Sequence, residues 1–368
     1  MKIRVPEYRG DFKILSLALD ERTKEDLIAE AVEFIYAEPT EAIIYPTKEI
    51  LTHDSDTLAK LRECNNYDVF EISDEGLLFR CYDDSSVENT LFITEKCNSN
   101  CIMCPSPDSS RQRGEGMKIS DLITLASHIP SDTSHITVTG GEPFMAGKEI
   151  FRLFEYCRDK FQDTEFLILT NGRIFAVKEY CELLSATIPI HTLVGVPLHG
   201  SCAHIHDAIT RAEHSFDQTL TGLKRLQSLG IKTEIRIVVC RNNAEDLPNI
   251  AALIAAQLMN VDHVSIMAME MTGNAYKNFD NVWIPYKDSF TYIRQAIEIL
   301  IAAGINVKLY NFPLCTVDKE YWMICAKSIS SWKVRYAPIC DNCSERSSCG
   351  GVFAGSYRMV SSELEALA

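Results

Sequence analysis

The chain of 368 residues is 46% hydrophobic and 24% charged, a composition typical of a folded protein with a sizeable core. Its formal net charge of −15 argues against nucleic acid as a substrate, because phosphate binding needs a cationic face. The first residues lack the apolar core of a secretory signal, and the longest apolar runs, such as 250–259, are too short to span a membrane. We therefore expect a cytoplasmic protein, whose 14 cysteines are metal ligands or buried apolar side chains rather than disulfides.

Three regions follow one another along the chain. Residues 1–88 combine a helical pattern at 24–36 with short β-rich runs, which predicts a small α+β module. Between 89 and 312, β-rich runs alternate with amphipathic helical stretches, which predicts an α/β fold with a parallel sheet, a partial (β/α)6-type barrel. The predicted strands are near 90–96, 135–139, 165–170, 191–198, 233–240, 262–269 and 305–310, and the predicted helices are 118–129, 148–160, 175–185, 216–229, 246–258 and 287–303. Residues 313–368 lose this pattern and predict a separate cysteine-rich domain.

The most informative motif is a C-x3-C-x2-C run behind the first barrel strand, formed by Cys97, Cys101 and Cys104. Three thiolates on one loop are one short of the four that close an ordinary iron–sulfur cluster, so one iron would stay open for a ligand. A zinc site is the alternative, but zinc needs a fourth ligand, and His128 and His135 stand at no recognised spacing.

Other candidate residues follow or lie in later strands. Gly140-Gly141-Glu142-Pro143 comes after the second strand, where glycines let the backbone approach a ligand; by itself it also fits a plain turn. Asn171 follows the third strand and His199 the fourth, at the end of a barrel where chemistry is usually found. Arg236 lies inside the fifth strand and needs a partner there, either a cofactor carboxylate or a neighbouring acidic side chain.

The cysteine triad together with Gly140–Pro143 resembles the radical S-adenosylmethionine (SAM) superfamily. The resemblance implies a [4Fe–4S] cluster on Cys97, Cys101 and Cys104, with SAM on the open iron. Reductive cleavage of SAM would give a 5′-deoxyadenosyl radical that abstracts a hydrogen atom. The resemblance also implies a cofactor-binding set of Met103, which stands where an aromatic residue is more common, Gly140, Gly141, Glu142, Pro143, Asn171, His199 and Arg236.

The tail carries Cys340-x2-Cys343-x5-Cys349 followed by two glycines. This run resembles the auxiliary-cluster domains called SPASM and Twitch, although Phe353 stands where the longer form has a further cysteine. The resemblance implies one auxiliary [4Fe–4S] cluster. Its fourth ligand is predicted to be Cys315, with Cys325 as the rival, and a structural zinc ion is the alternative to the cluster.

Residues from about 89 to 357 further resemble the radical SAM maturases of the His-Xaa-Ser peptide system, through 91–101, Trp332-Lys333 and 349–353. This resemblance implies a ribosomally made precursor peptide, a second radical SAM maturase as partner, and an external electron donor. The module at 1–88 would bind the leader of the precursor by adding a strand to its sheet.

Two other functions compete with a peptide maturase: a radical SAM enzyme that acts on a small metabolite, and a non-enzymatic iron–sulfur carrier or sensor. The catalytic acid or base remains open, with Glu270, Tyr276, Cys202 and Cys325 as unranked candidates.

Overall fold

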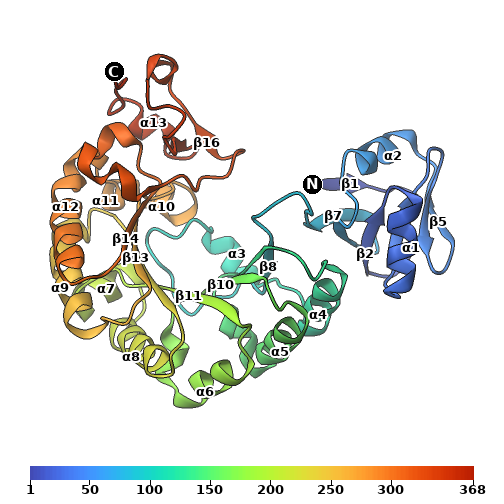
Figure 1. The fold of residues 1–368 in the computed structure, drawn as a ribbon, viewed down its shortest axis with the longest axis horizontal. Coiled ribbons are helices and arrows are strands. Elements are labelled where there is room, and N and C mark those ends of the chain that lie inside the picture. The colour runs from blue at the N-terminus through green and yellow to red at the C-terminus, as the bar shows by residue number, and fades with distance from the viewer.

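A parallel sheet of eight strands forms the centre of the molecule in the computed structural model, which describes residues 1–368 (Figure 1). The strand order is β15-β14-β13-β12-β11-β10-β9-β8, so neighbours in sequence are neighbours in space. The strands are β8 (Thr90–Phe92), β9 (His135–Thr139), β10 (Glu165–Leu169), β11 (His191–Pro197), β12 (Thr233–Val238), β13 (His263–Met267), β14 (Val307–Tyr310) and β15 (Cys325–Ala326). The seven strands predicted between 90 and 310 are all present.

Helices cover the outer face of this curled sheet (Figure 1). All six predicted helices are confirmed, and most of their bounds differ from the prediction by only one or two residues. They are α4 (Ile119–His128), α5 (Ile150–Lys160), α6 (Lys178–Thr187), α8 (Ser215–Ser228), α9 (Leu247–Gln257) and α12 (Tyr286–Ala302). Short elements occupy the loops between them: α3 (Asp108–Arg113), η1 (Pro143–Glu149), η2 (Arg173–Ala176), α7 (Ala203–Thr210), η3 (Ala244–Asp246), α10 (Gly273–Lys277) and α11 (Phe279–Val282).

The barrel is open on one side, because β8 and β15 are the two free edges of the sheet. Its outward-facing strand residues, such as Ile136 and Ile168, are fully buried under the helices. The residues that alternate with them along the strands and point to the inner face, such as Thr137 and Leu167, are only half-buried. The inner face of the sheet is therefore not packed solid, in contrast to a closed barrel whose interior is filled with side chains.

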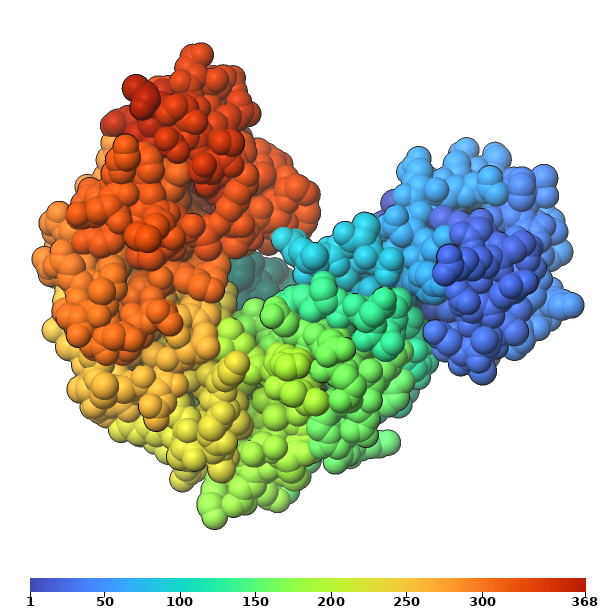
Figure 2. Space-filling model, in the orientation of Figure 1, coloured from blue at the N-terminus to red at the C-terminus, as the bar shows by residue number.

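The tail reaches across the open side of the barrel. In Figure 2, orange-red residues of the tail face cyan residues of the linker that precedes β8. There the Ser330 hydroxyl donates a hydrogen bond to Glu88 Oε2 at 2.6 Å. Thus the two ends of the open sheet are linked through segments outside it.

Residues 1–82 form a second sheet with its own hydrophobic core. Its strand order is β1-β7-β6-β2-β3-β4-β5, in which only β2 and β3 are parallel. The elements are β1 (Lys2–Arg4), β2 (Lys13–Ala18), α1 (Glu21–Ala29), β3 (Phe34–Ala37), β4 (Ala42–Tyr45), β5 (Glu49–Thr52), α2 (Ser55–Arg62), β6 (Val69–Ile72) and β7 (Leu77–Tyr82). The prediction of one helix over 24–36 is wrong at its end, because the β-branched and aromatic residues of 34–37 pair with β2 instead.

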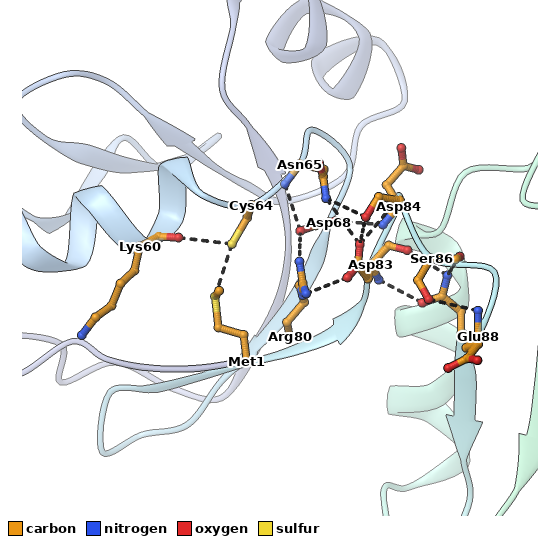
Figure 3. Close-up of polar contacts among 12 residues, drawn as sticks. Met1, Lys60, Cys64, Asn65, Asp68, Arg80, Asp83, Asp84, Ser86 and Glu88 are labelled. Atoms are coloured by element: carbon orange, nitrogen blue, oxygen red, sulfur yellow. Dashed lines mark hydrogen bonds and ion pairs between the residues drawn. The ribbon is translucent and has the colours of Figure 1, made fainter. Parts of the chain in front are cut away.

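Two sets of contacts fix this module against the barrel. At the interface, Ser16 Oγ and His128 Nδ1 are 2.9 Å apart in a buried hydrogen bond between β2 and α4. Just before β6, the fully buried Asp68 of the module accepts hydrogen bonds from Arg80 Nη1 at 2.9 Å and from the N–H of Asp84 in the linker at 2.8 Å (Figure 3). Asp68 thereby holds β7 and the start of the linker together.

The tail contains η4 (Leu314–Thr316), η5 (Lys319–Ile324), β16 (Val334–Arg335), η6 (Pro338–Asn342), β17 (Val352–Phe353) and α13 (Tyr357–Val360). It packs on the loop after β13, where the buried Ser356 hydroxyl donates to Met269 O at 2.9 Å and accepts from the Met271 N–H at 3.1 Å. Cys325–Ala326, which the sequence placed in the tail, extends the barrel sheet beside β14. None of the helices is long and apolar enough to cross a membrane.

Removing the Asp68 carboxylate should destabilise the module and its linker. Asp68→Ala leaves the Arg80 guanidinium and two backbone N–H groups without their acceptor, so we expect a loss of about 3 kcal/mol in the free energy of unfolding, measured by urea denaturation. The exposed Asp74 is the matched control, and Asp74→Ala should change stability by less than about 0.5 kcal/mol. Equal stabilities for the two variants would contradict this role of Asp68.

Candidate functional site

The three cysteines of the C-x3-C-x2-C motif lie on one loop between β8 and α3. Residues 97–104 form neither helix nor strand, and their internal backbone hydrogen bond runs from the Cys104 N–H to Cys101 O at 3.2 Å. Backbone polar groups need partners when they are withdrawn from water. The other partners of this loop come from segments that follow three other barrel strands.

The Gly140-Gly141-Glu142 segment after β9 packs against the chain that enters the cysteine loop. The Gly141 N–H donates to Thr94 O at 2.7 Å, and the Glu142 N–H donates to Lys96 O at 2.8 Å. A Cβ on Gly140 would lie 2.5 Å from Thr94 O, and one on Gly141 would lie 2.4 Å from Lys96 O. The close approach that these glycines allow is therefore to the protein's own backbone.

The side chain of Glu142 is engaged in the interior. It is 2% exposed, and its carboxylate accepts hydrogen bonds from Thr170 Oγ1 at 2.8 Å and from the Asn171 N–H at 2.6 Å. Burial raises the pKa of Glu142, although these hydrogen bonds lower it. The carboxylate thus holds the loop after β10, and the buried Pro143 beside it begins η1.

The loop after β10 contacts the cysteine loop directly. Asn171 Nδ2 donates to Asn98 Oδ1 at 2.6 Å, and Arg173 Nη1 donates to Asn98 O at 2.6 Å and to Ser99 Oγ at 3.1 Å. Sequence reasoning found Asn171 but missed Arg173. No local pattern marks Arg173, because its partners lie more than 70 residues earlier.

Two further segments complete the surroundings of the loop. After β11, Thr210 O and Ile209 O accept from the N–H groups of Asn100 and Ile102 at 3.0 and 2.9 Å. These carbonyls lie at the end of α7, where helix carbonyls have no partner within the helix.

After β13, α10 contributes two asparagines that the sequence did not single out. The buried Asn274 donates its N–H to Cys104 O at 2.9 Å and its Nδ2 to Cys101 O at 3.1 Å. Asn278 Nδ2 donates to Ile102 O at 2.9 Å. The carbonyls of the cysteine loop are therefore bound by side chains about 170 residues away.

The thiols themselves are largely withdrawn from water. Burial raises the pKa of Cys97 and raises that of Cys101 to about 12, while the charge of Arg111 acts in the opposite direction. The structure contains no group of three or more His, Cys, Asp or Glu side chains arranged so that they could hold a metal ion. The donor chemistry of three thiols on one braced loop nonetheless fits an iron–sulfur cluster.

Residues 91–254, which include this loop, match the family model described as the radical SAM superfamily. This region is similar to radical SAM domains. Homologues of this domain are enzymes, and the family implies SAM and a [4Fe–4S] cluster.

Curated relatives match this chain with low identity. Fe-coproporphyrin III synthase of Methanosarcina barkeri is 25% identical over 62% of this chain and 54% of its own length. The antilisterial bacteriocin subtilosin biosynthesis protein AlbA of Bacillus subtilis is 28% identical over 44% of this chain and 35% of its own. The 7-carboxy-7-deazaguanine synthase of Rhodopirellula baltica is 25% identical over 50% of this chain and 66% of its own. The chain thus spans between about a third and two thirds of these relatives.

Among solved structures, Streptococcus suis SuiB bound to SAM superposes with a TM-score of 0.52 and 15% identity. The superposition covers 72% of this chain and 56% of SuiB. It supports the α/β fold with a curled, partly closed sheet.

Outside the radical SAM domain, four cysteines of the tail line one cavity. Cys315, Cys340, Cys343 and Cys349 share it with Tyr336 and other residues. Cys325, the rival for the fourth ligand, lines a different cavity beside β14. As the fourth cysteine of the tail group, Cys315 is therefore better placed than Cys325.

The segment 269–278 contacts both groups of cysteines. Its first residues bind the tail through Ser356, and its later residues bind the cysteine loop through Asn274 and Asn278. Gly273 is required between them, because a Cβ there would lie 2.3 Å from Pro105 O.

His199 lies buried at the end of β11, stacked on His206 with 6.0 Å between the ring centroids. The His199 N–H donates to His206 Nδ1 at 3.1 Å, whereas His199 Nδ1 is buried without a partner. Burial lowers the pKa of His199 to about 3 and that of His206 to about 4. Both rings are therefore neutral near pH 7.

Arg236 has a protein partner. Its Nη1 lies 2.9 Å from both carboxylate oxygens of Glu234 on the same strand. Burial raises the pKa of Glu234, but the hydrogen bond from His263 and the charge of Arg236 outweigh it and hold that pKa at about 2. Of the two partners considered for Arg236, the neighbouring carboxylate is the one observed.

The remaining candidates are scattered. Met103 is 5% exposed and belongs to the main hydrophobic core. Among the possible acid–base residues, Tyr276 is 65% exposed on α10, Cys202 is exposed at the start of α7, and Cys325 lies in the β14–β15 cavity. Glu270 is ion-paired to Lys333 at 3.2 Å, just after β13.

The buried histidine pair should make stability fall at acid pH. A histidine whose folded-state pKa is lowered contributes stability above its unfolded pKa of about 6.5 and loses it as the pH falls below that value. His206→Asn keeps an acceptor for the His199 N–H but does not titrate. Between pH 7 and pH 5, this variant should lose about 2 kcal/mol less than the wild type, measured by urea denaturation at each pH.

The exposed His204 on the same helix is the control. His204→Asn should lose as much stability between the two pH values as the wild type. A His206→Asn variant with the full wild-type loss would contradict the assignment.

Proposed function

We propose that the protein is a radical SAM enzyme that modifies a ribosomally made precursor peptide. The observation that carries the radical SAM part is the cysteine loop, which lies inside the matched domain and is braced by residues after β9, β10, β11 and β13. When bound, the [4Fe–4S] cluster and SAM would supply a 5′-deoxyadenosyl radical able to abstract a hydrogen atom from an unactivated C–H bond.

The residues of this chain have distinct proposed tasks. Cys97, Cys101 and Cys104 hold the cluster. The backbone of Gly140–Glu142 receives the amino group of SAM, and Asn171 keeps this loop against the cysteines. Since the Glu142 carboxylate already accepts three hydrogen bonds, its side chain is assigned to positioning rather than to cofactor contact.

His199 and Arg236 are the polar groups proposed to face the cofactor from the inner side of the barrel. His199 Nδ1 is buried and lacks a partner, so a donor from a ligand would satisfy it. Arg236 is held by Glu234 through Nη1, and its remaining N–H groups stay available for a carboxylate. Met103 and Pro143 contribute apolar surroundings.

A peptide substrate is supported by AlbA, the relative named for the biosynthesis of a bacteriocin, and by the open barrel with its half-buried inner face. The His-Xaa-Ser class of precursor, a second radical SAM maturase and an external electron donor are the partners we propose. The free edge strands β1 and β5 of the N-terminal sheet would bind the leader by strand addition. Because a reducing compartment keeps cysteine ligands from forming disulfides, the cytoplasm is the proposed location.

A small-metabolite substrate is the second candidate function. It is favoured by the relatives named as an Fe-coproporphyrin III synthase and a 7-carboxy-7-deazaguanine synthase. The tail distinguishes the two proposals, because an auxiliary cluster on Cys315, Cys340, Cys343 and Cys349 would suit a peptide maturase. Zinc at the same four thiolates remains the alternative occupant.

Anaerobically reconstituted protein should contain about eight irons if both sites hold cubanes, and about four irons with one zinc if the tail binds zinc. Cys101→Ala should remove about four irons and abolish release of 5′-deoxyadenosine from SAM, because the cluster loses one of its three ligands. Iron analysis and chromatography of the reduced reaction measure both effects.

Two variants control this experiment. Cys181→Ala, at a buried cysteine between α6 and η2, should keep the iron and the cleavage activity. Cys343→Ala should spare SAM cleavage and lose only the tail metal. Cleavage by a Cys101→Ala protein would overturn the role of the triad.

Co-expression with candidate precursor peptides tests the substrate class. A precursor with His-Xaa-Ser repeats should gain a mass change of a few hydrogen atoms in the presence of this protein, and none with the Cys101→Ala variant. Mass spectrometry of the isolated peptide detects the change. Unmodified peptides together with turnover of a small metabolite would favour the second candidate.

A further inference from the structure

The segment 363–367 runs along the cavity that the four tail cysteines line. Glu365 and Leu367 are among the residues that form the cavity wall, and Leu364 is 6% exposed and belongs to the main hydrophobic core. In Figure 1 this part of the chain lies beside α13 and the tail loops. No sequence motif marked it as part of a site.

Leu367 ties one end of this segment to the cysteines. Its N–H donates to Cys343 Sγ at 3.4 Å, and its carbonyl accepts from the N–H of Ser344 at 2.9 Å and from the Ser344 hydroxyl at 3.1 Å. Three hydrogen bonds to two consecutive residues fix the position of Leu367 relative to Cys343.

Lys287, at the start of α12, holds the other end. Its N–H donates to Glu363 Oε2 at 3.2 Å, and its ammonium group forms an ion pair with Glu365. The segment is thus attached to a barrel helix on one side and to the cysteine cavity on the other.

Other backbone N–H groups in the cavity also point at sulfur. Cys349 Sγ accepts from Leu314 at 3.5 Å and from Gly351 at 3.4 Å. Donors aimed at thiolate ligands stabilise their negative charge and, with the surrounding shell, limit the access of water to a bound metal. The Leu367 N–H is the backbone donor to Cys343 Sγ.

We propose that the segment 363–367 is a cover of the tail cysteine site, which donates to the Cys343 thiolate and slows the loss of the metal held there. The proposal deepens the proposed function, since it requires that the four tail cysteines bind a metal. A site with four thiolates and such a cover has no position for a substrate, so its chemistry is restricted to electron transfer or to structural support.

The test uses the full chain with Cys97, Cys101 and Cys104 replaced by serine, so that the tail holds the only cysteine cluster. Cobalt(II) is the probe, because its thiolate charge-transfer absorption reports binding to sulfur, and its release to an added chelator is followed over time. Leu367→Pro deletes the N–H donor to Cys343, whereas Leu367→Ala retains it. A variant lacking 363–368 removes the cover as a whole.

We expect about tenfold faster cobalt release from Leu367→Pro and from the shortened variant, and an unchanged rate from Leu367→Ala. Equal release rates in all four proteins, with the charge-transfer band present, would overturn the cover while leaving the tail metal site in place. A parent protein that shows no cobalt–thiolate band would overturn the tail site and the cover together. Iron–sulfur assembly on the triad is not involved in either outcome.

Discussion

The backbone of residues 97–104 depends on the rest of the barrel for its hydrogen bonds. A loop without secondary structure cannot satisfy its own polar groups, and here the partners come from segments after three other strands, β10, β11 and β13. Arg173 and the Asn274 amide donate to carbonyls of the loop, and the Thr210 carbonyl at the end of α7 accepts from one of its N–H groups. The glycines after β9 pack against residues 94–96, which lead into the loop. The cysteines are consequently positioned by segments that follow several strands of the sheet.

Much of the barrel could be predicted because each strand and helix carries its own periodicity in the sequence. The placement of the cysteine, glycine and asparagine motifs in the loops after β8, β9 and β10 could be predicted as well, because each motif follows an apolar run in the sequence. The contacts of these residues were harder to foresee: the glycine pair packs against the backbone of Thr94 and Lys96, and Arg236 has Glu234 as its partner. Arg173 and Asn274 were missed because their partners are distant in sequence. The helix predicted over 24–36 failed at its end because strand pairing outweighed helical propensity.

The inner face of the barrel sheet differs from its outer face in the burial of its side chains. Helices cover the outer side chains, while several inner ones, such as Thr137 and Leu167, are only half-buried. Glu234 and Arg236 on β12 form an ion-paired cluster with His263 on the neighbouring strand β13. A buried carboxylate is tolerable there because its partners compensate for its desolvation. The inner face thus combines partly exposed side chains with a buried, paired charged group.

The segment 269–278 has a consequence for how the two groups of cysteines behave together. One stretch of chain is hydrogen-bonded to Ser356 in the tail and to Cys101 and Cys104 through Asn274. A displacement of this stretch would therefore shift both groups of cysteines at once. Substitutions in the tail and in the triad are expected to be non-additive, because the two groups share this stretch of chain.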